Sequence, residues 1–411
     1  MTVLIPDLLA TSSFPEEAPY RVTEMMTRPG LMLALAIVQL VMAGLMSRWT
    51  RPRPWWAAAG VLLAIAAVFF ALANWGTSDI ARFNHFLGVD PTRVLDEPFW
   101  LLLAPLIVAL PYRMASVQGL VAAGYALVPM LLARSWGVAR WGGWWALGLI
   151  WSPLLRNFLQ NGVTRQALAT VLITPVLVRA AGWARPAWPW LAGSVLASAL
   201  AHHSLPGTLA LALLPALLRP GLLREGPRLP LALEGRARWI AGLLLLAGAA
   251  VVLALIGPLV LDKVEFYFTR SSYFNSYALK GAVFWMEAAS FVTVLLTIWR
   301  ARLRRCDLAG CHESRTVLVF TLLLVAVQIT VWQDWGAPIT SRFLDPVGLI
   351  WMLSLMAFTR RHGCPWALIP VLLVSGVYFI DDRIIFSGTI RCHVDDQFLC
   401  LPDRPPWAVT H

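Results

Sequence analysis

The sequence predicts an all-α, polytopic integral membrane protein with about twelve crossings and one further re-entrant or interfacial segment that does not cross. Of its 411 residues, 59% are hydrophobic and only 13% are charged, whereas a soluble domain carries about 25% charged residues. Long apolar stretches follow one another from residue 31 to residue 380, and the charges gather in the gaps between them. Each stretch is expected to be helical, because lipid offers no partner to a bare backbone amide or carbonyl.

Arginine-rich gaps orient the chain. Residues 48–54, 219–238, 300–315 and 360–362 are short and dense in arginine, while the other gaps are mixed or acidic. Positive residues favour the cytoplasmic side of a membrane, so these four gaps are predicted to be cytoplasmic. The first of them follows the first apolar segment and the last precedes the final one. Both ends of the chain are therefore expected outside.

Parity limits the number of crossings. Thirteen apolar segments are present, at 31–47, 55–75, 98–110, 116–133, 143–155, 163–181, 188–201, 205–218, 239–261, 283–299, 316–332, 343–358 and 364–380. Two external ends require an even number, so one segment does not cross. Segment 143–155 is the best candidate, because it is short, opens with a tryptophan pair and ends at Pro153. Segments 98–110 and 205–218 are also shorter than the ~20 residues of a full crossing. With this choice, residues 134–165 are expected outside.

Three regions follow from this topology: an external N-terminal tail (1–29), a transmembrane helical domain (30–380) and an external C-terminal tail (381–411). The C-terminal tail holds Cys392 and Cys400. Outside the cytoplasm their spacing suits a disulfide, and two unpaired thiols are the alternative. The net charge of +11 does not indicate nucleic-acid binding, because no basic stripe with interleaved aromatic residues is present.

Two carboxylates in the first external gap are candidates for acid–base chemistry. Asp79 lies near the start of this gap, and Glu97 precedes Pro98 at the start of the next apolar segment. Either carboxylate would serve as a general base or as a ligand for sugar hydroxyls. The alternatives are a capping role for Glu97 near a helix N-terminus and an ion pair between Asp79 and Arg82.

Arginines at the mouths of two later segments are candidates for binding an anion. Arg156, Arg165 and Gln166 flank the start of one segment, and Arg342 begins another. A helix N-terminus beside an arginine is a good phosphate site, and an arginine in the membrane is costly without an anionic partner. The alternatives are snorkelling to lipid phosphate and, for Arg342, an ion pair with Asp334.

A histidine pair interrupts two apolar segments. His202 and His203 are followed by Ser204, and a histidine at such a break accepts a proton near neutral pH. His202 is therefore a candidate general base, and a polar turn bonded to the backbone is the alternative. No metal site is expected here, because neighbouring histidines on a turn diverge and no third ligand has suitable spacing.

Aromatic residues in the later external gaps suit a glycan. Tyr267, Tyr273 and Tyr277 lie among serines and an asparagine, and Trp335 lies in a further external gap. Sugar rings stack on aromatic faces while their hydroxyls take hydrogen bonds. Anchoring of these side chains at the membrane interface is the alternative interpretation.

The order of these motifs resembles one family, the EpsG/Wzy-type membrane polymerases of bacterial exopolysaccharides. The family pattern has Gly-Thr-Asp and an aromatic residue after the second span, Glu-Pro opening the third, an Arg-Gln pair before an alanine-rich helix, and His-x-Ser after the next span. The matching residues are Gly76, Thr77, Asp79 and Phe83; Glu97 and Pro98; Arg165, Gln166 and Ala169; His202 and Ser204; and, later, Ser341, Arg342 and Phe343. The main resemblance covers about residues 30–220. Ser78 is inserted before Asp79, and Phe83 stands where the family favours tyrosine.

The resemblance implies a glycosyltransferase-C-like helical fold and polymerisation of undecaprenyl-pyrophosphate-linked oligosaccharide repeats. The active site would face the periplasm from the bacterial inner membrane, with a flippase and chain-length or export proteins as partners. Pyrophosphate leaves readily once arginines hold its charge, so neither a metal nor another cofactor is required. The acceptor hydroxyl needs a base, for which His202, Asp79 and Glu97 are the candidates.

Three other functions use similar residues. A transporter or flippase of lipid-linked sugars would share the arginines and aromatics, but its polar groups should reach the midplane from both sides. An O-antigen ligase-like glycosyltransferase differs only in its acceptor. A sugar acyltransferase would normally present its histidine to an acyl donor delivered from the cytoplasm.

Overall fold

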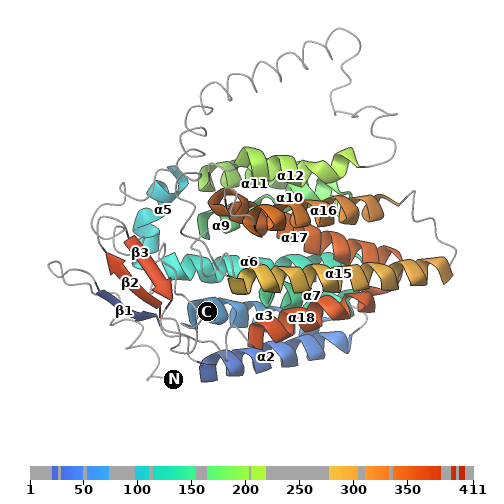
Figure 1. Cartoon of the computed structure of the whole chain (residues 1–411), viewed down its shortest axis with the longest axis horizontal. Coiled ribbons are helices and arrows are strands. Elements are labelled where there is room, and N and C mark those ends of the chain that lie inside the picture. Colours follow the sequence, from blue (N-terminus) through green and yellow to red (C-terminus); the bar gives the residue numbers. More distant parts are fainter. Residues whose placement is uncertain are drawn as a thin grey trace, which may run out of the picture.

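The structure, a computed structural model of the whole chain, forms a bundle of helices with a small sheet beyond one end (Figure 1). It describes residues 21–25, 29–49, 53–73, 98–110, 114–153, 164–202, 205–218, 277–303, 311–332, 337–380, 390–394 and 398–402. Three helices in this part are long and apolar enough to cross a membrane, over Gly30–Ser47, Pro54–Ala71 and Ser116–Ser135. The prediction of a helical membrane protein is confirmed at this level.

The helices follow the predicted apolar segments closely. In the first part of the chain they are α2 (Pro29–Ser47), α3 (Pro54–Ala73), α5 (Pro98–Ala109), α6 (Met114–Ser135), η2 (Ala139–Trp141) and α7 (Gly142–Ile150). The next group is α9 (Thr164–Leu172), α10 (Thr174–Ala180), α11 (Trp188–Ala201) and α12 (Leu205–Leu217). The last group is α15 (Tyr277–Leu303), α16 (His312–Trp332), α17 (Ala337–Arg361), η4 (Pro365–Leu368) and α18 (Ile369–Phe379). The predicted segment 239–261 lies outside the described residues.

A three-stranded antiparallel sheet joins the two tails. Its strands, in spatial order, are β1 (Arg21–Met25), β2 (Ile390–Val394) and β3 (Phe398–Pro402). Because β1 precedes α2 and β2 follows α18, both tails lie at one end of the bundle, which we call the sheet end. Tails on one side require an even number of crossings, as the parity argument assumes.

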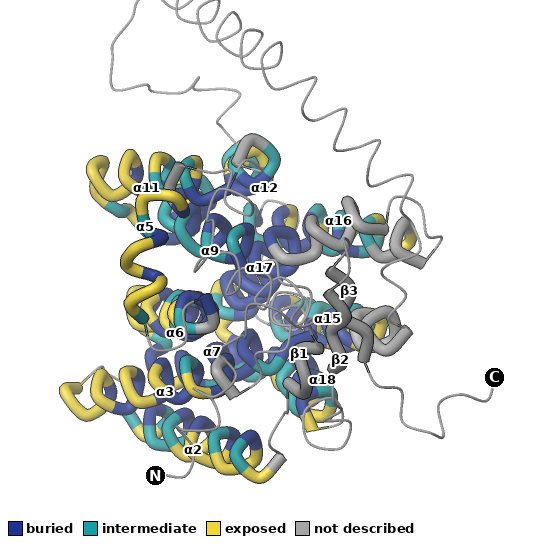
Figure 2. Tube along the Cα trace, turned by 90° about the vertical axis from the view of Figure 1, so that its left-hand side faces the viewer, coloured by how far each residue is buried: buried dark blue, intermediate teal, exposed yellow. Residues whose placement is uncertain are grey.

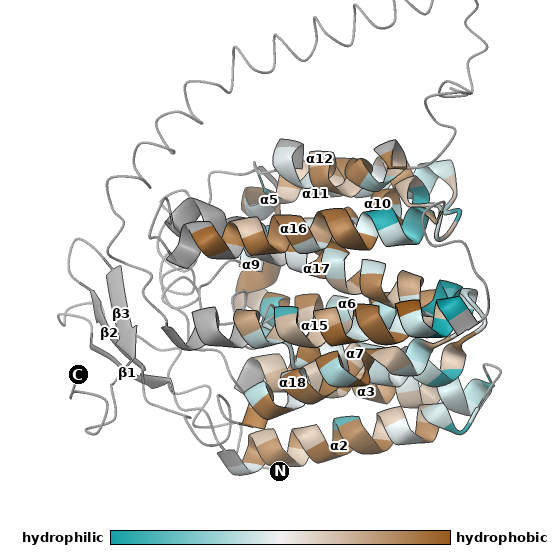
Figure 3. Cartoon of the chain, turned by 45° about the vertical axis from the view of Figure 1, so that its right-hand side comes forward, coloured by the Kyte–Doolittle hydropathy of each residue, from teal (hydrophilic) through white to brown (hydrophobic). Residues whose placement is uncertain are grey.

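The opposite end, which we call the arginine end, gathers several helix connections. Trp56 Nε1, at the start of α3, donates to the carbonyl of Ala139 at 3.0 Å. Trp136 Nε1, after α6, donates to the carbonyl of Trp183 at 2.9 Å. Hydrophilic residues concentrate there (Figure 3). The arginines in these connections and at the adjoining helix ends are Arg48, Arg53, Arg134, Arg140, Arg179, Arg185, Arg300, Arg302, Arg315, Arg360 and Arg361.

The prediction that segment 143–155 is a re-entrant or interfacial segment on the outer face is wrong. A Cβ atom added at Gly142 would lie 3.3 Å from Met130 Cα and 3.4 Å from Trp56, so α7 begins at the arginine end. From there α7 runs inward until Trp151 Nε1 donates to Gln39 Oε1 at 2.6 Å. The Gly-Gly-Trp-Trp sequence suggested an interfacial hairpin, but the glycines admit neighbouring helices. Residues 134–143 therefore belong to the arginine end.

Helix α5 is the apolar helix that stays at the sheet end. Trp100 Nε1 donates to the carbonyl of Ala201 at the end of α11, at 2.7 Å. The other end of α5 leads to the start of α6, which runs antiparallel to α3 with Gly119 against Val68. Viewed onto the sheet end, α5 spans the distance between α11 and α6 (Figure 2). Its 12 residues extend only about 18 Å, and Leu102 is 78% exposed.

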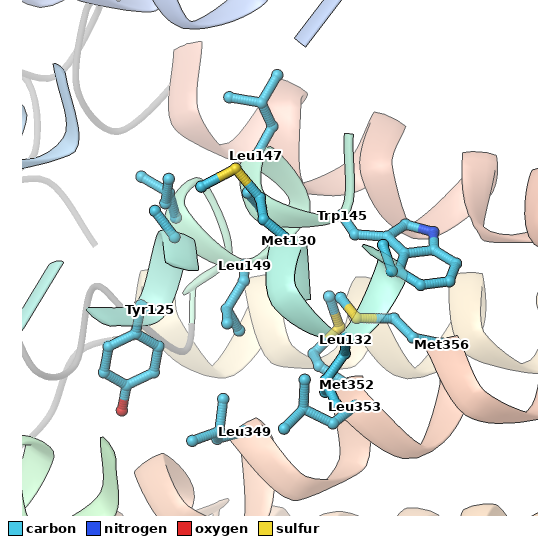
Figure 4. Close-up of a cluster of buried hydrophobic side chains, with 14 of the residues drawn as sticks. Tyr125, Met130, Leu132, Trp145, Leu147, Leu149, Leu349, Met352, Leu353 and Met356 are labelled. Atoms are coloured by element: carbon cyan, nitrogen blue, oxygen red, sulfur yellow. The ribbon is translucent and has the colours of Figure 1, made fainter. Parts of the chain in front are cut away.

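Helix α7 occupies the centre of the bundle. All its residues except Trp144 are buried, as expected for a helix that is apolar on every side. Its side chains meet those of α6 and α17 in one cluster (Figure 4). This cluster contains Tyr125, Met130, Leu132, Trp145, Leu147, Leu149, Leu349, Met352, Leu353 and Met356.

The outside of the bundle is apolar, as lipid contact requires. Large hydrophobic side chains are exposed on α2, α3, α6, α11, α15, α16 and α18. Four of the exposed tryptophans lie near the arginine end, at Trp55, Trp188, Trp190 and Trp299, and another, Trp285, lies in the first half of α15. Exposed tryptophans near helix ends are typical of a membrane–water interface.

Single-cysteine labelling checks this arrangement. In a background lacking all five native cysteines, we expect an impermeant maleimide to label Ser12→Cys and Thr410→Cys in intact cells. It should label Ser135→Cys only after permeabilisation, because the end of α6 lies at the arginine end. Labelling of Ser135→Cys together with either tail in intact cells would contradict the arrangement.

Candidate functional site

The best-defined part of the predicted site lies where α9 and α11 reach the sheet end. Arg165 and Gln166 stand in the first turn of α9, and His202 follows the last residue of α11. Helix α11 starts near Trp183 at the arginine end and finishes beside Trp100 at the sheet end, while α9 and α10 run the opposite way. The two helical runs are therefore antiparallel.

One hydrogen bond fixes the register of these helices. Ser198 Oγ donates to the carbonyl of Ala169 at 2.9 Å. His202 lies one helical turn beyond Ser198, and Arg165 lies one turn beyond Ala169, both toward the sheet end. One turn is about 5.4 Å in each helix. The sequence-predicted Arg165 and His202 thus stand at the same level on neighbouring helices.

His202 lies immediately after the end of α11 and is not itself helical. Its backbone is extended (φ −162°, ψ 136°), and its N–H still donates to the carbonyl of Ser198 at 3.2 Å. Helix α12 begins at Leu205. The His202 side chain is only 4% exposed. The imidazole is therefore enclosed at a break between two helices, where its partners are set by the fold.

The start of α9 combines a positive charge with buried polar groups. Thr164 and Gln166 are buried, and Arg165 is half-buried between them. Within the part of the chain that the structure describes, the Thr164 hydroxyl has no hydrogen-bond partner. A helix N-terminus presents free amides and a positive dipole end, so this arrangement suits an anion.

No acidic residue occurs in a long stretch around this site. Between Glu97 and Glu225 the sequence contains arginine and histidine but neither aspartate nor glutamate. Helices α5, α6, α7, α9, α10, α11 and α12 all fall in this stretch. The formal charges that these elements carry are therefore all positive, which favours a negatively charged ligand over a neutral one.

Two further predicted residues have only their backbone described. Arg342 lies in the second turn of α17, and Tyr277 opens α15. Helix α17 ends with Arg360 and Arg361 at the arginine end. Its first turns, which include Arg342, therefore lie at the sheet end. The predicted residues Asp79, Glu97, Arg156, Tyr267, Tyr273 and Trp335 lie outside the described residues.

Sequence reasoning missed the polar contacts that position this region. Trp100 is fully buried and ties α5 to α11. Trp151, bonded to Gln39, stacks on Phe379 with ring centroids 4.9 Å apart. A glutamine or serine inside an apolar segment would have indicated such contacts, because polar side chains in membrane helices hydrogen-bond to neighbouring helices.

Titratable residues also meet at the arginine end. The Cys311 thiol donates to Glu313 Oε2 at 3.0 Å. Burial raises the pKa of the Cys311 thiol, and this hydrogen bond adds to the increase. Burial lowers the pKa of His362. The His362 ring packs edge-on against the Phe358 ring, with the ring centroids 4.9 Å apart. Among the described residues, no three His, Cys, Asp or Glu side chains gather as a metal site would require.

Comparisons of this chain with protein-family models, with curated proteins and with solved structures give no match.

The Trp100 contact yields a stability prediction. We expect Trp100→Phe to lower the free energy of unfolding by about 1 kcal/mol, the net value of one hydrogen bond, with a further loss if the Ala201 carbonyl stays unpaired. The measurement is thermal unfolding of detergent-purified protein at one scan rate. Trp190→Phe is the matched control, because Trp190 is 73% exposed. Equal shifts for the two variants would count against an anchoring role.

Proposed function

We propose that this protein polymerises oligosaccharide repeats linked to undecaprenyl pyrophosphate, at the sheet end of the bundle. The observation that supports this most directly is the pairing of α9 with α11. It brings Arg165, at a helix N-terminus, level with the enclosed His202. A charge-binding group beside a titratable group is what transfer from a lipid pyrophosphate needs.

The distribution of charge supports an external site. Arginines of many connections share one end of the bundle, including Arg134, which lies in a connection that the apolar segments alone placed outside. The positive-inside rule assigns that end to the cytoplasm. The sheet end, with both tails, then faces the periplasm from the bacterial inner membrane. Exchanging segment 143–155 for α5 as the non-crossing segment keeps the proposed number of crossings at about twelve.

The proposed reaction is a single displacement at the anomeric carbon of the donor repeat. The acceptor hydroxyl oxygen attacks that carbon, the bond to the pyrophosphate oxygen breaks, and the configuration inverts. Arg165 and Arg342, with Arg156 and Gln166, hold the departing pyrophosphate, whose charge develops as the bond breaks. Arginine suits this role, since its planar group donates two parallel hydrogen bonds to phosphate.

His202 is the proposed base. Its imidazole takes the proton of the acceptor hydroxyl as the new glycosidic bond forms. Asp79 and Glu97 remain the other candidates, and Glu97 precedes the α11-bound Trp100 by three residues in the sequence. Tyr267, Tyr273, Tyr277 and Trp335 are proposed to stack on the sugar rings. The metal-free scheme needs no cofactor.

The arginines give one test. We expect Arg165→Lys and Arg342→Lys to lose most polymerase activity, because a point charge replaces a bidentate group on phosphate. The assay is polymer yield from lipid-linked repeat at equal expression. Arg179→Lys is the matched control, since Arg179 stands at the arginine end of the α9–α10 run. Normal yield in either variant would remove that arginine from the site.

The base gives a second test. We expect His202→Ala to lower the polymerisation rate about 100- to 10,000-fold while binding of the lipid-linked repeat is kept, because a base acts in the transition state. Purified enzyme with lipid-linked repeat is scored as a ladder on a gel, and binding is measured separately.

Asp79→Asn and Glu97→Gln are the comparison variants. A normal ladder from His202→Ala with none from Glu97→Gln would assign the base to the carboxylate. Wild-type protein that moves lipid-linked repeat across vesicle membranes and makes no ladder would instead identify a flippase. Transfer of the repeat only to a lipid A-type acceptor would identify a ligase.

A further inference from the structure

The C-terminal hairpin places two cysteines opposite each other. In the register of β2 and β3, Cys392 pairs directly with Cys400. Residues directly opposite in an antiparallel pair have Cα atoms about 4.5–5.5 Å apart. This range falls within the roughly 4.4–6.8 Å that a disulfide spans. The eight-residue spacing suited a disulfide, with two unpaired thiols as the alternative, and the register adds an observation in favour of the disulfide.

The other described cysteines lie at the arginine end, opposite the sheet. Cys311 and Cys364 are buried and form no disulfide, and they lie just before α16 and just after α17. Both positions belong to the arginine end, where the Cys311 thiol donates to Glu313. Cysteines outside any disulfide on one side of a membrane and a facing pair of cysteines on the other are typical of a protein that separates a reducing from an oxidising compartment.

We propose that Cys392 and Cys400 form a disulfide that closes the β2–β3 hairpin and holds β2 in the register that β1 binds. The two thiols lose two protons and two electrons as the sulfur–sulfur bond forms. The disulfide of a thiol oxidase in that compartment takes up these two protons and two electrons and becomes a dithiol. The disulfide requires the sheet end to face an oxidising compartment, and it does not depend on the polymerase activity.

The disulfide has a structural consequence for both tails. Cys392 is paired on its other side with Val22 of β1. Strand β2 is therefore the central strand, and the hairpin that the disulfide closes is the platform for the N-terminal tail. A two-stranded hairpin is marginal by itself in water, so a covalent link gives β1 a preformed edge to pair with.

Thiol counting in the full chain tests the proposal. Cells expressing the protein are treated with N-ethylmaleimide before lysis, the protein is then denatured in the presence of N-ethylmaleimide so that buried thiols also react, and adducts are counted by mass. Of the five cysteines, we expect three adducts without reductant and all five after reduction. Cys392→Ser and Cys400→Ser should each raise the unreduced count to four, because the remaining partner becomes free.

Cys364→Ser is the matched control and should lower the unreduced count to two. Peptide mapping must join residue 392 to residue 400 within one chain. Five adducts without reductant, or a bond between two chains on a non-reducing gel, would overturn the proposal. Loss of ladder formation in a protein with three unreduced adducts would count against the polymerase function and leave the disulfide standing.

Discussion

Close approach of helix backbones at glycine holds the centre of the bundle together. A Cβ atom at Gly143 would lie 2.7 Å from Ala43 Cα, and one at Gly142 would lie 3.3 Å from Met130 Cα. At Gly148 an added Cβ atom would instead meet the side chain of Leu372. Helix α7 thus contacts α2, α6 and α18 through three small residues. In lipid, where burial of apolar surface adds little, such close packing is the main source of helix association.

The candidate site depends on that packing through a short series of contacts. Gly124 lets α6 approach Val171, so α9 is held close against α6. Ala169 then accepts from Ser198, which sets α11 against α9, and the end of α11 is fixed in turn by Trp100. Each step joins a side chain to a glycine or to a backbone carbonyl of the neighbouring helix. The level of His202 relative to Arg165 therefore depends on the side chains of Val171, Ser198 and Trp100.

Much of the helix content followed from the apolar segments, since α2, α3, α6 and α17 lie where the hydrophobic stretches predict. The packing role of the glycines could not be predicted, because a sequence such as Gly142-Gly143 followed by two tryptophans fits an interfacial turn and a packed core equally well. The sheet was also missed: β1 pairs with a strand at the other end of the chain, and local patterns carry no information about so distant a partner. For the site, residue type identified Arg165 and His202, whereas their common level depends on Ser198, an unremarkable serine in an apolar run.

The pairing of the first strand with the last part of the chain imposes an order of assembly. Met25 pairs with Ile390, so nearly every helix has to be inserted before the sheet can close. At ~5–20 residues per second of synthesis, the N-terminal strand waits on the order of 20–70 s for its partner. Its edge must stay soluble and unpaired for that time. A prematurely terminated chain never supplies the partner, and its exposed first strand would distinguish it from a finished molecule for any protease that surveys the membrane.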